Sequence, residues 1–318
     1  MTKGKILFTN PGIHPYLAEQ LQKRGFDCKF DYTTPKEELI LSDYIGVIMK
    51  SRFNADKAFF EKAPNLKFLA RVGVGYEHID MDYAKQIGVP VLLSPEGSID
   101  AVGEHTIGMI LSLFNHLNRG DRQIRQGQWV REANRGVELK GKTVGIIGYG
   151  NMGQSLAKKL SGFEVNAIAY DKYRTNYGDQ YAKAVSLNTL FEESDLISIH
   201  IYYDAANHYF INQDFLAQFK KPIYVINTAR GKVLNTADLV AAMETGKVLG
   251  AGLDVIEYEK QSFESFTAAH LPAPYHYLVH SDRVILSPHI AGWTQESKLG
   301  HAKTLVRKIS ELRIEGQL

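Results

Sequence analysis

Three glycines follow an apolar run near the middle of the chain in the pattern Gly-x-Gly-x-x-Gly. Gly148, Gly150 and Gly153 come directly after residues 143–147 and open a segment with helical spacing, residues 154–160. The first glycine permits a tight turn, the second lets the backbone approach a pyrophosphate, and the third lets a helix pack closely on a strand. The amides and dipole at the start of that helix attract phosphates. A glycine-rich structural turn would look the same, so the pattern needs support from its surroundings.

An acidic residue supplies that support. Asp171 ends the next apolar run, residues 165–170, and lies 18 positions beyond Gly153 (171 − 153). At about this spacing a carboxylate accepts hydrogen bonds from the ribose hydroxyls of a dinucleotide. A carboxylate there repels a 2′-phosphate, which favours NAD over NADP, although the neighbouring Lys172 and Arg174 could accommodate that phosphate. The alternative is that Asp171 is an ordinary turn residue after a strand.

Three further motifs place an arginine, acids and a histidine just after apolar runs. Arg230 follows residues 223–226, and His289 follows residues 284–286. The acids after the run 251–255 or within its end are Asp254, Glu257 and Glu259. The carboxyl ends of parallel strands meet at one edge of a sheet, so we expect these side chains to lie together. Singly, the arginine could pair with a structural acid and the histidine could be structural, but a crevice that holds all three types is harder to explain as packing.

The elements that position these residues alternate between short apolar runs and amphipathic segments. This rhythm predicts repeated strand–helix units and a mostly parallel sheet. The expected strands of the first part are residues 5–9, 44–49, 67–72 and 89–93, with helices over 16–23 and 56–62. The stronger runs, rich in β-branched residues, are 143–147, 165–170, 196–200, 223–226, 251–255 and 284–286. Because these runs are apolar on both faces, they fit central strands covered by helices on both sides.

The order of these elements predicts an α/β protein of two domains. We expect a doubly wound, parallel-sheet NAD-binding (Rossmann) domain over residues 99–293. It is inserted into a smaller, flavodoxin-like α/β substrate domain formed by residues 1–98 and 294–318. A buried helix over 101–117 joins the two, and the Arg-rich stretch 119–138 shows little periodicity. Residues 261–282 are too long and aromatic for a simple turn, and a folded loop is expected there, with Phe263, Phe266, Tyr275 and Tyr277 in a small packed cluster.

Composition narrows the class further. The chain has 318 residues, 44% hydrophobic and 23% charged, with a formal net charge of +2. Such a charge gives no sign of a nucleic-acid or membrane partner. Cys28 is the only cysteine, which excludes an intramolecular disulfide and a thiolate zinc cluster, and no metal site is expected. The N-terminus does not have the pattern of a secretory signal, so we expect a cytoplasmic protein.

Five short motifs occur in order along the chain. They are Arg-Val-Gly-Val-Gly-Tyr at 71–76, Val-Gly-Glu-His-Thr at 102–106, Leu-Lys-Gly-Lys-Thr-Val-Gly-Ile-Ile-Gly-Tyr-Gly at 139–150, Asn-Thr-Ala-Arg-Gly at 227–231 and Ser-Pro-His-Ile-Ala-Gly at 287–292. With these motifs, the sequence resembles the D-isomer-specific 2-hydroxyacid dehydrogenases over nearly its whole length. The resemblance implies Arg230, Glu259 and His289 as the catalytic residues, and it selects Glu259 over Glu257 because the family's glutamate lies five residues after the aspartate.

The resemblance also implies a mechanism. His289 would donate a proton to the carbonyl oxygen of a 2-oxo acid as hydride arrives from the nicotinamide, and Glu259 would orient the imidazole and favour its charged form. Arg230 would bind the substrate carboxylate, with backbone amides of Val74 and Gly75. Closure of the two domains would exclude water. The residues implied to line the cofactor, besides the three glycines and Asp171, are Thr106, Asn151, Met152, His200, Thr228, Ala229, Asp254 and Gly292.

The substrate and the loops are less determined. Relatives often have proline after the catalytic glutamate and two places after the histidine of the fourth strand, where this chain has Lys260 and Tyr202. Lys50-Ser-Arg52 resembles a segment that faces substrate in phosphoglycerate dehydrogenases, and its cations could hold a phosphate or simply be solvated. We therefore expect 3-phosphoglycerate as the leading substrate and bound partly by Arg52, with D-lactate, glyoxylate and hydroxypyruvate as alternatives. The chain ends soon after its last helix, so no serine feedback through a further domain is expected.

The family also implies an assembly and an alternative. Subunits of the family form homodimers by exchanging a long helix and the arm after it, here residues 101–117 and 119–138, with Trp129 as an anchor. Related transcriptional corepressors keep the dinucleotide fold and the catalytic residues yet act as NAD-responsive binding proteins. Turnover separates the two functions, because such a scaffold binds NADH but hardly oxidises it.

Overall fold

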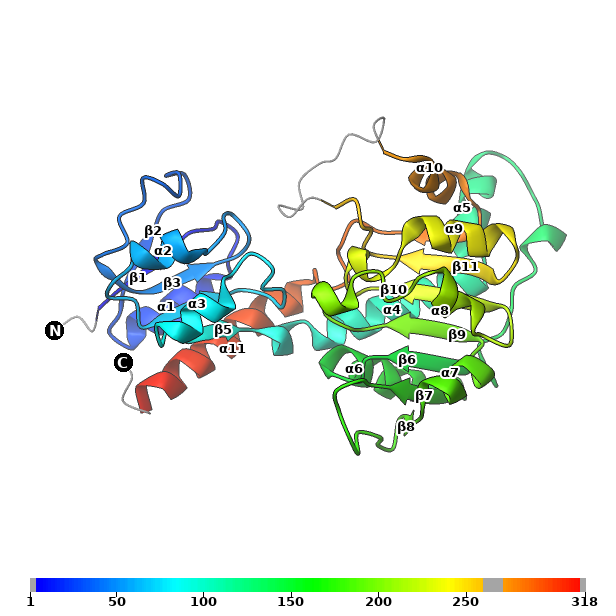
Figure 1. Cartoon of the computed structure of the whole chain (residues 1–318). Helices are drawn as coiled ribbons and strands as arrows, with labels where there is room; N and C mark the ends of the chain where they lie inside the picture. The colour runs from blue at the N-terminus through cyan, green and yellow to red at the C-terminus, as the bar shows by residue number, and fades with distance from the viewer. Residues whose placement is uncertain (1–3, 260–270, 315–318) are drawn as a thin grey trace. The chain divides into compact units, whose positions relative to one another are not determined.

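The computed structural model describes residues 4–259 and 271–314 and divides the chain into two units (Figure 1). The first unit is formed by residues 1–98 and 293–318, and the second by residues 99–292. The two junctions therefore follow Ser98 and Gly292, and the second unit is an insertion in the sequence of the first.

The first unit is built on a five-stranded parallel sheet in the order β2-β1-β3-β4-β5. This is the strand order of flavodoxin-like folds. Its strands are β1 (Lys5–Phe8), β2 (Asp27–Phe30), β3 (Tyr44–Met49), β4 (Phe68–Arg71) and β5 (Val91–Leu93). Its helices are α1 (Pro15–Lys23), α2 (Lys57–Glu61), α3 (Met81–Gln86), the short 3-10 helix η1 (Pro95–Gly97) and α11 (Gln295–Ile314).

The strands of this sheet are apolar on both faces because each face is covered. Ile6 and Phe8 of β1 pack with α1 and α11, in a core that includes Leu305. Leu7, between them, points to the other face and packs with Phe59 of α2. The successive residues of a strand point to opposite faces, so a continuous apolar run is what a doubly covered strand requires.

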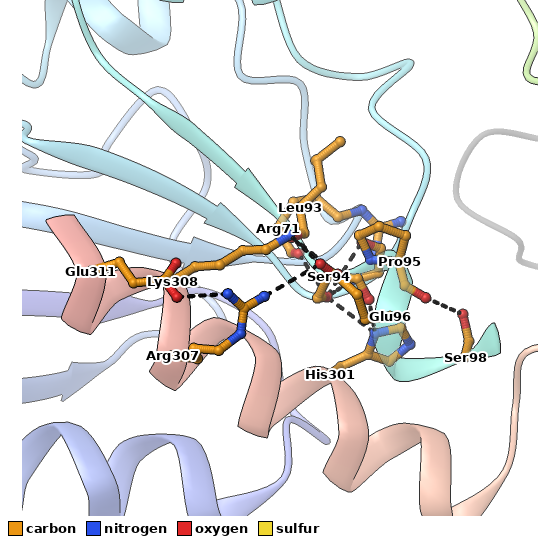
Figure 2. Close-up of polar contacts among 11 residues, drawn as sticks. Arg71, Leu93, Ser94, Pro95, Glu96, Ser98, His301, Arg307, Lys308 and Glu311 are labelled. Carbon is orange, nitrogen blue, oxygen red and sulfur yellow. Dashed lines mark hydrogen bonds and ion pairs between the residues drawn. The ribbon is translucent and has the colours of Figure 1, made fainter. Parts of the chain in front are cut away.

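Helix α11 is fastened to η1 and to the end of β5 (Figure 2). The Nδ1 of His301 lies 2.7 Å from the Ser94 carbonyl oxygen and 3.1 Å from its hydroxyl. Lys308 donates to the Leu93 carbonyl at 2.8 Å and pairs with Glu96. These contacts join the last helix to the segment that ends at the first junction between the units.

The second unit is built on a seven-stranded parallel sheet in the order β12-β11-β10-β9-β6-β7-β8. Its strands are β6 (Thr143–Ile147), β7 (Asn166–Tyr170), β8 (Lys183–Ala184), β9 (Leu196–Ile199), β10 (Ile223–Asn227), β11 (Val248–Leu253) and β12 (Val284–Leu286). Its helices are α4 (Ile99–Phe114), α5 (Leu117–Arg125), α6 (Asn151–Leu160), α7 (Leu187–Glu193), α8 (Gln213–Ala217), α9 (Thr236–Glu244) and α10 (Ala273–His280). Its 3-10 helices are η2 (Glu132–Asn134), η3 (Ser161–Phe163), η4 (Ala205–Asn207) and η5 (Gly231–Val233).

The chain order reverses direction at β6, which lies between β7 and β9. Helices cover both faces of this sheet as well. One face packs on α4 and α6, with Ile110 and Leu156 in the core, and the other packs on α7, α8 and α9. The doubly wound fold predicted from the sequence is confirmed. A crevice for a ligand is expected outside the carboxyl end of β6, where the strand order reverses.

Several elements differ from the sequence prediction. Strands β2 and β8 were not predicted, since each is short and carries exposed polar residues. Residues 119–125 belong to the helix α5, which begins at Leu117 and has a largely polar composition. The helix predicted over 101–117 ends at Phe114, and His116 has a left-handed backbone with φ of 51°. Of the segment 261–282, Phe263 and Phe266 lie outside the described residues, whereas Tyr275 is buried on α10.

No helix in the described ranges combines the length and apolar character that a membrane span needs.

Candidate active site

The turn between β6 and α6 has the shape of a phosphate cradle. Gly148 has φ of +92°, and a Cβ there would lie 2.6 Å from the His200 carbonyl oxygen. A Cβ on Gly153 would lie 2.2 Å from the Gly148 carbonyl oxygen, so helix and turn touch backbone to backbone. A Cβ on Gly150 would meet nothing within 4 Å. Helix α6 starts after Gly150 with no side-chain cap, so amides at its N-terminus face this space. A pyrophosphate fits these residues. Two of the expected cofactor residues, Asn151 and Met152, form the first turn of α6.

Asp171 directly follows β7, and backbone amides fix its carboxylate. Its Oδ2 accepts from the amide of Tyr149 at 2.9 Å, and its Oδ1 accepts from those of Tyr173 at 3.0 Å and Arg174 at 3.1 Å. Three amides leave acceptor capacity on the two oxygens for ribose hydroxyls. The guanidinium of Arg174 donates to the Tyr149 carbonyl and is thus turned toward the glycine turn.

The other expected cofactor residues lie along the same edge of the sheet. Thr106 on α4 is buried, and its hydroxyl lies 3.2 Å from that of Thr228, which follows β10. Ala229 comes next and donates its amide to Asn227 at 3.0 Å. His200 follows β9, and its Nε2 lies 2.8 Å from the Ser198 hydroxyl.

His200 is a half-buried ring with one shielded nitrogen. Its Nδ1 is screened from solvent and has no hydrogen-bond partner among the described residues. Burial lowers the pKa of His200 to about 4, so the ring is neutral at physiological pH. A shielded polar atom without a partner beside the glycine turn suits a site that a bound molecule completes.

A contact between a histidine and a glutamate joins the loops that follow β12 and β11. The Nδ1 of His289 lies 2.6 Å from Oε2 of Glu259. Glu259 is held in turn, because its Oε1 accepts from the Ile256 amide at 2.5 Å. The backbone of His289 is left-handed, with φ of 57°, and its amide donates to the Asp254 carbonyl at 2.8 Å. Unusual backbone of this kind persists where surrounding contacts determine it, which is common at functional sites.

Glu257, the other acid after β11, has different partners. Its Oε2 accepts from the hydroxyl of Tyr209, and its Oε1 accepts from the Thr236 amide at 2.9 Å. Hydrogen bonding to Glu257 raises the pKa of Tyr209 to about 12. Glu257 therefore fastens the loop after β11 to α9, whereas Glu259 contacts the histidine.

Asp254 organises the loop that carries His289. It is 1% exposed, and its carboxylate accepts from the Ser287 hydroxyl at 2.5 Å and from the amides of Ile290 and Ala291, each at 2.8 Å. His105 of α4 lies 3.0 Å from the Ser287 hydroxyl. His105 and Ser287 lie within the motifs at 102–106 and 287–292, but the motifs alone do not indicate this contact. Gly292 ends this loop at the second junction.

Arg230 lies at the carboxyl end of β10, next to the Glu259 loop. Its carbonyl accepts from the Asn227 side chain at 3.0 Å, and its Nη1 donates to the Ala229 carbonyl at 2.7 Å. A Cβ on Gly231 would lie 2.1 Å from backbone atoms of Ile256, so only glycine lets the two loops approach so closely. Arginine, glutamate and histidine thus come from three adjacent strands at one edge of the sheet.

Three residues of the first unit were expected to bind substrate, namely Arg52, Val74 and Gly75. Arg52 donates to the backbone carbonyls of Thr9 at 3.2 Å and Asp31 at 3.0 Å, and also to that of Thr34. Its guanidinium thus ties backbone segments together. Val74 and Gly75 follow β4, directly after Gly73, whose amide donates to the Ser94 hydroxyl at 2.8 Å.

Lys50 lies near other cations in the same unit. Its Nζ lies 5.3 Å from the centre of the Trp293 ring and 3.3 Å from the Gly12 carbonyl oxygen. Burial lowers the pKa of Lys50, and the nearby charges of Lys298 and Arg71 lower it further. Cations placed so closely favour an anion beside them.

Comparisons with known proteins show the family of the chain. Residues 107–291 match the model of the family described as "D-isomer specific 2-hydroxyacid dehydrogenase, NAD binding domain". The chain is 36% identical over 288 residues to a glyoxylate reductase of Thermofilum pendens, covering 88% of this chain and 82% of the relative. It is 32% identical over 299 residues to a D-3-phosphoglycerate dehydrogenase of Archaeoglobus fulgidus, covering 93% of this chain but 54% of that relative.

A solved structure gives the same result. A D-lactate dehydrogenase of Aquifex aeolicus, crystallised with NAD and lactic acid, has a TM-score of 0.82 and 30% identity, and the match covers 98% of this chain and 96% of that one. The chain belongs to the D-isomer specific 2-hydroxyacid dehydrogenases. It is an NAD-dependent oxidoreductase that acts on the CH–OH group of a 2-hydroxy acid.

Proposed function

We propose that Arg230, Glu259 and His289 carry out the reaction, and that the favoured substrate pair is 3-phosphoglycerate and 3-phosphohydroxypyruvate. The observation that carries the catalytic assignment is the 2.6 Å contact between His289 Nδ1 and Glu259 Oε2. A carboxylate bound to one ring nitrogen fixes the orientation of the imidazole and stabilises its protonated form.

The mechanism follows from the donors of these residues. A dinucleotide held at the glycine turn would supply the hydride that reduces the carbonyl carbon of the 2-oxo acid. His289 donates a proton from Nε2, the nitrogen opposite its Glu259 contact, to the carbonyl oxygen, and the product is the 2-hydroxy acid. Arg230 binds the substrate carboxylate with its planar guanidinium, which can donate two parallel hydrogen bonds. In the oxidative direction His289 takes the proton back.

The cation group around Lys50 supports a substrate with a second anionic group. Lys50 has two further cations near it, and an added phosphate would offset their mutual repulsion. The backbone amides of Val74 and Gly75, on the loop beside Arg71, are proposed to receive the carboxylate. Because the guanidinium of Arg52 is used on three carbonyls, Lys50 is the better candidate for the phosphate.

The test measures the oxidation of NADH, followed by its absorbance, with each of a panel of 2-oxo acids. We expect 3-phosphohydroxypyruvate to have the highest kcat/KM, and Lys50→Met to lower it without affecting glyoxylate. Lys57→Met is the matched control, since Lys57 also lies over an aromatic ring, 5.6 Å from the centre of Tyr83. A preference for glyoxylate or pyruvate would overturn the substrate proposal alone. His289→Ala should abolish turnover with NADH affinity retained, and full activity in that variant would overturn the catalytic assignment.

We also propose that the chain forms a homodimer through α5 and the segment after it. Leu117, Ile124 and Trp129 are 55%, 52% and 81% exposed, and a second copy would cover these three apolar side chains. Light scattering should give twice the chain mass, and Trp129→Ala should weaken the association. A monomer at working concentration would overturn this proposal.

A further inference from the structure

A buried serine at the end of β5 holds the loop that follows β4. Ser94 comes directly after Leu93, the last residue of β5, which pairs with Arg71, the last residue of β4. The amide of Ser94 donates to the Gly73 carbonyl at 2.9 Å, and its hydroxyl accepts from the Gly73 amide at 2.8 Å. Ser94 therefore binds both the donor and the acceptor of the Gly73 backbone.

The backbone of Gly73 has a conformation that depends on such contacts. Its φ is +139°, which L side chains rarely adopt, and a Cβ there would overlap Nη1 of Arg71. The guanidinium of Arg71 thus lies directly against this glycine. Unusual backbone persists where the surrounding contacts determine it, and the two hydrogen bonds to Ser94 are contacts of this kind.

The two residues after Gly73 have amides that suit a bound anion. The amides of Val74 and Gly75 donate to no acceptor within the described residues, although Gly75 is buried and Val74 is half-buried. Buried amides are normally paired, so two consecutive amides of this kind fit an acceptor such as a carboxylate. These are the amides proposed above to receive the substrate carboxylate, and the charge of Arg71 beside them favours an anion.

Helix α11 holds the same serine from another side, as Figure 2 shows. The Nδ1 of His301 lies 2.7 Å from the Ser94 carbonyl oxygen and 3.1 Å from the hydroxyl oxygen. A carbonyl oxygen can only accept, so Nδ1 carries a proton and donates to Ser94. Burial lowers the pKa of His301, and the charges of Arg71 and Lys50 lower it further, so the ring is neutral at pH 7. The serine that fixes Gly73 is thus itself fixed by α11.

We propose that Ser94 is a positioning residue for the substrate and that His301 holds it in place. The Ser94 hydroxyl sets the amides of Val74 and Gly75 where they receive the carboxylate of the 2-oxo acid. Without that hydroxyl the buried Gly73 amide loses its acceptor, so the loop relaxes and the substrate binds less tightly. The proposed catalytic and cofactor residues belong to the second unit and are unaffected. The inference rests on the proposed carboxylate site and adds the two side chains that shape it.

The test compares Ser94→Ala with the wild-type protein at saturating NADH. The readouts are steady-state kinetics, a direct NADH titration and inhibition by oxamate, an unreactive analogue of a 2-oxo acid. We expect the KM of the best 2-oxo acid and the inhibition constant of oxamate each to rise by roughly tenfold or more. The kcat should stay within about threefold and the NADH affinity within about twofold of wild type, as for a loss of substrate binding alone.

Ser98→Ala is the matched control for that substitution. Ser98 is also buried, four positions further along the same segment, but its hydroxyl donates to the Pro95 carbonyl at 3.5 Å. This variant should keep the wild-type KM and oxamate inhibition. Equal losses in Ser94→Ala and Ser98→Ala, or a parallel loss of NADH affinity, would indicate general damage to the fold and would overturn the proposal.

Variants of α11 separate the positioning of Ser94 from the anchoring of the helix. His301→Leu removes the donor and should raise both constants several-fold, whereas His301→Asn keeps a donor close to the place of Nδ1 and should restore them. Lys308→Met removes a different contact of α11, the one to the Leu93 carbonyl at 2.8 Å, and should lower thermal stability without changing either constant. Thermal unfolding checks every variant, and the His301 pair carries the test if Ser94→Ala does not fold.

Amide hydrogen exchange of residues 72–76 reports on the loop independently of the substrate, and Ser94→Ala should make it faster. Unchanged exchange would overturn the role of Ser94 alone. Faster exchange with unchanged KM and oxamate inhibition would mean that this loop does not receive the carboxylate, so the proposed carboxylate site would be wrong as well. If the wild-type protein reduced no 2-oxo acid, the proposed function itself would fail.

Discussion

Glu259 binds His289 through a 2.6 Å contact between Oε2 and Nδ1, although the two residues are 30 positions apart and come from different strands. Glu257, two residues from Glu259, contacts Tyr209 and the Thr236 amide instead. The same short loop thus holds one acid aimed at the histidine and one that fastens the loop. A pair of substitutions can separate the two roles.

Glu259→Gln should lower kcat/KM by roughly 100-fold or more, since the neutral amide keeps the size of the side chain but removes the charge that stabilises protonated His289. NADH affinity should stay within a few-fold of wild type. The measurement is steady-state kinetics with the best 2-oxo acid, together with a direct NADH titration.

Glu257→Gln is the matched control for that substitution. It removes the same charge two residues away, so activity should fall only a few-fold while thermal stability drops, by about 1–3 kcal/mol of unfolding free energy. If both variants lost activity equally, the distinction between the two glutamates would not hold.

Asp171→Asn should raise the ratio of kcat/KM for NADPH over NADH by about tenfold or more. The amide oxygen can still accept from the Tyr173 amide, but the charge that repels a 2′-phosphate is gone, and Lys172 and Arg174 remain. Asp179→Asn is a suitable control, because Asp179 also accepts from backbone amides, those of Tyr181 and Ala182. An unchanged ratio in Asp171→Asn would contradict the ribose role.

Whether a feature of the structure can be predicted from the sequence depends on how many positions separate the residues that form it. The glycine turn and its strand lie within a dozen residues, so periodicity and spacing were sufficient to predict them. The contact of Ser287 with Asp254 spans 33 positions, and that of His105 with Ser287 spans 182. No local pattern encodes such pairs. The short edge strands β2 and β8 were missed for a related reason, since pairing with a neighbour rather than composition makes them strands.

His200→Asn should make the free energy of unfolding of the cofactor-free protein depend less steeply on pH below 6.5. The pKa of His200 is lowered by burial to about 4, so below pH 6.5 the unfolded chain binds more protons than the fold. The contribution of the neutral His200 ring to the free energy of unfolding, at most about 3 kcal/mol, is present above pH 6.5. It is lost as the pH falls toward 4. Urea unfolding between pH 8 and 4.5 measures it. The exposed His280→Asn should keep the wild-type slope, and an identical slope in His200→Asn would contradict the assignment.

Gly300→Ala should destabilise the first unit, against the usual trend for helices. Alanine in place of glycine within a helix normally adds about 1 kcal/mol of stability. In α11, however, a Cβ on Gly300 would lie 2.7 Å from the carbonyl oxygen of Gly97 and 2.9 Å from its Cα. Backbone atoms cannot rotate away as a side chain can, so α11 and η1 must separate, and the contact of His301 with Ser94 must lengthen (Figure 2).

We expect Gly300→Ala to cost about 1–3 kcal/mol net, as overpacking does, and to increase amide hydrogen exchange in α11. Gly108→Ala is the matched control, because Gly108 is also helical and a Cβ there would meet nothing within 4 Å. That variant should be as stable as wild type or more so. If Gly300→Ala gained stability as well, helix propensity would outweigh the contact, and the close approach of Gly97 to α11 would not be what holds the last helix in place.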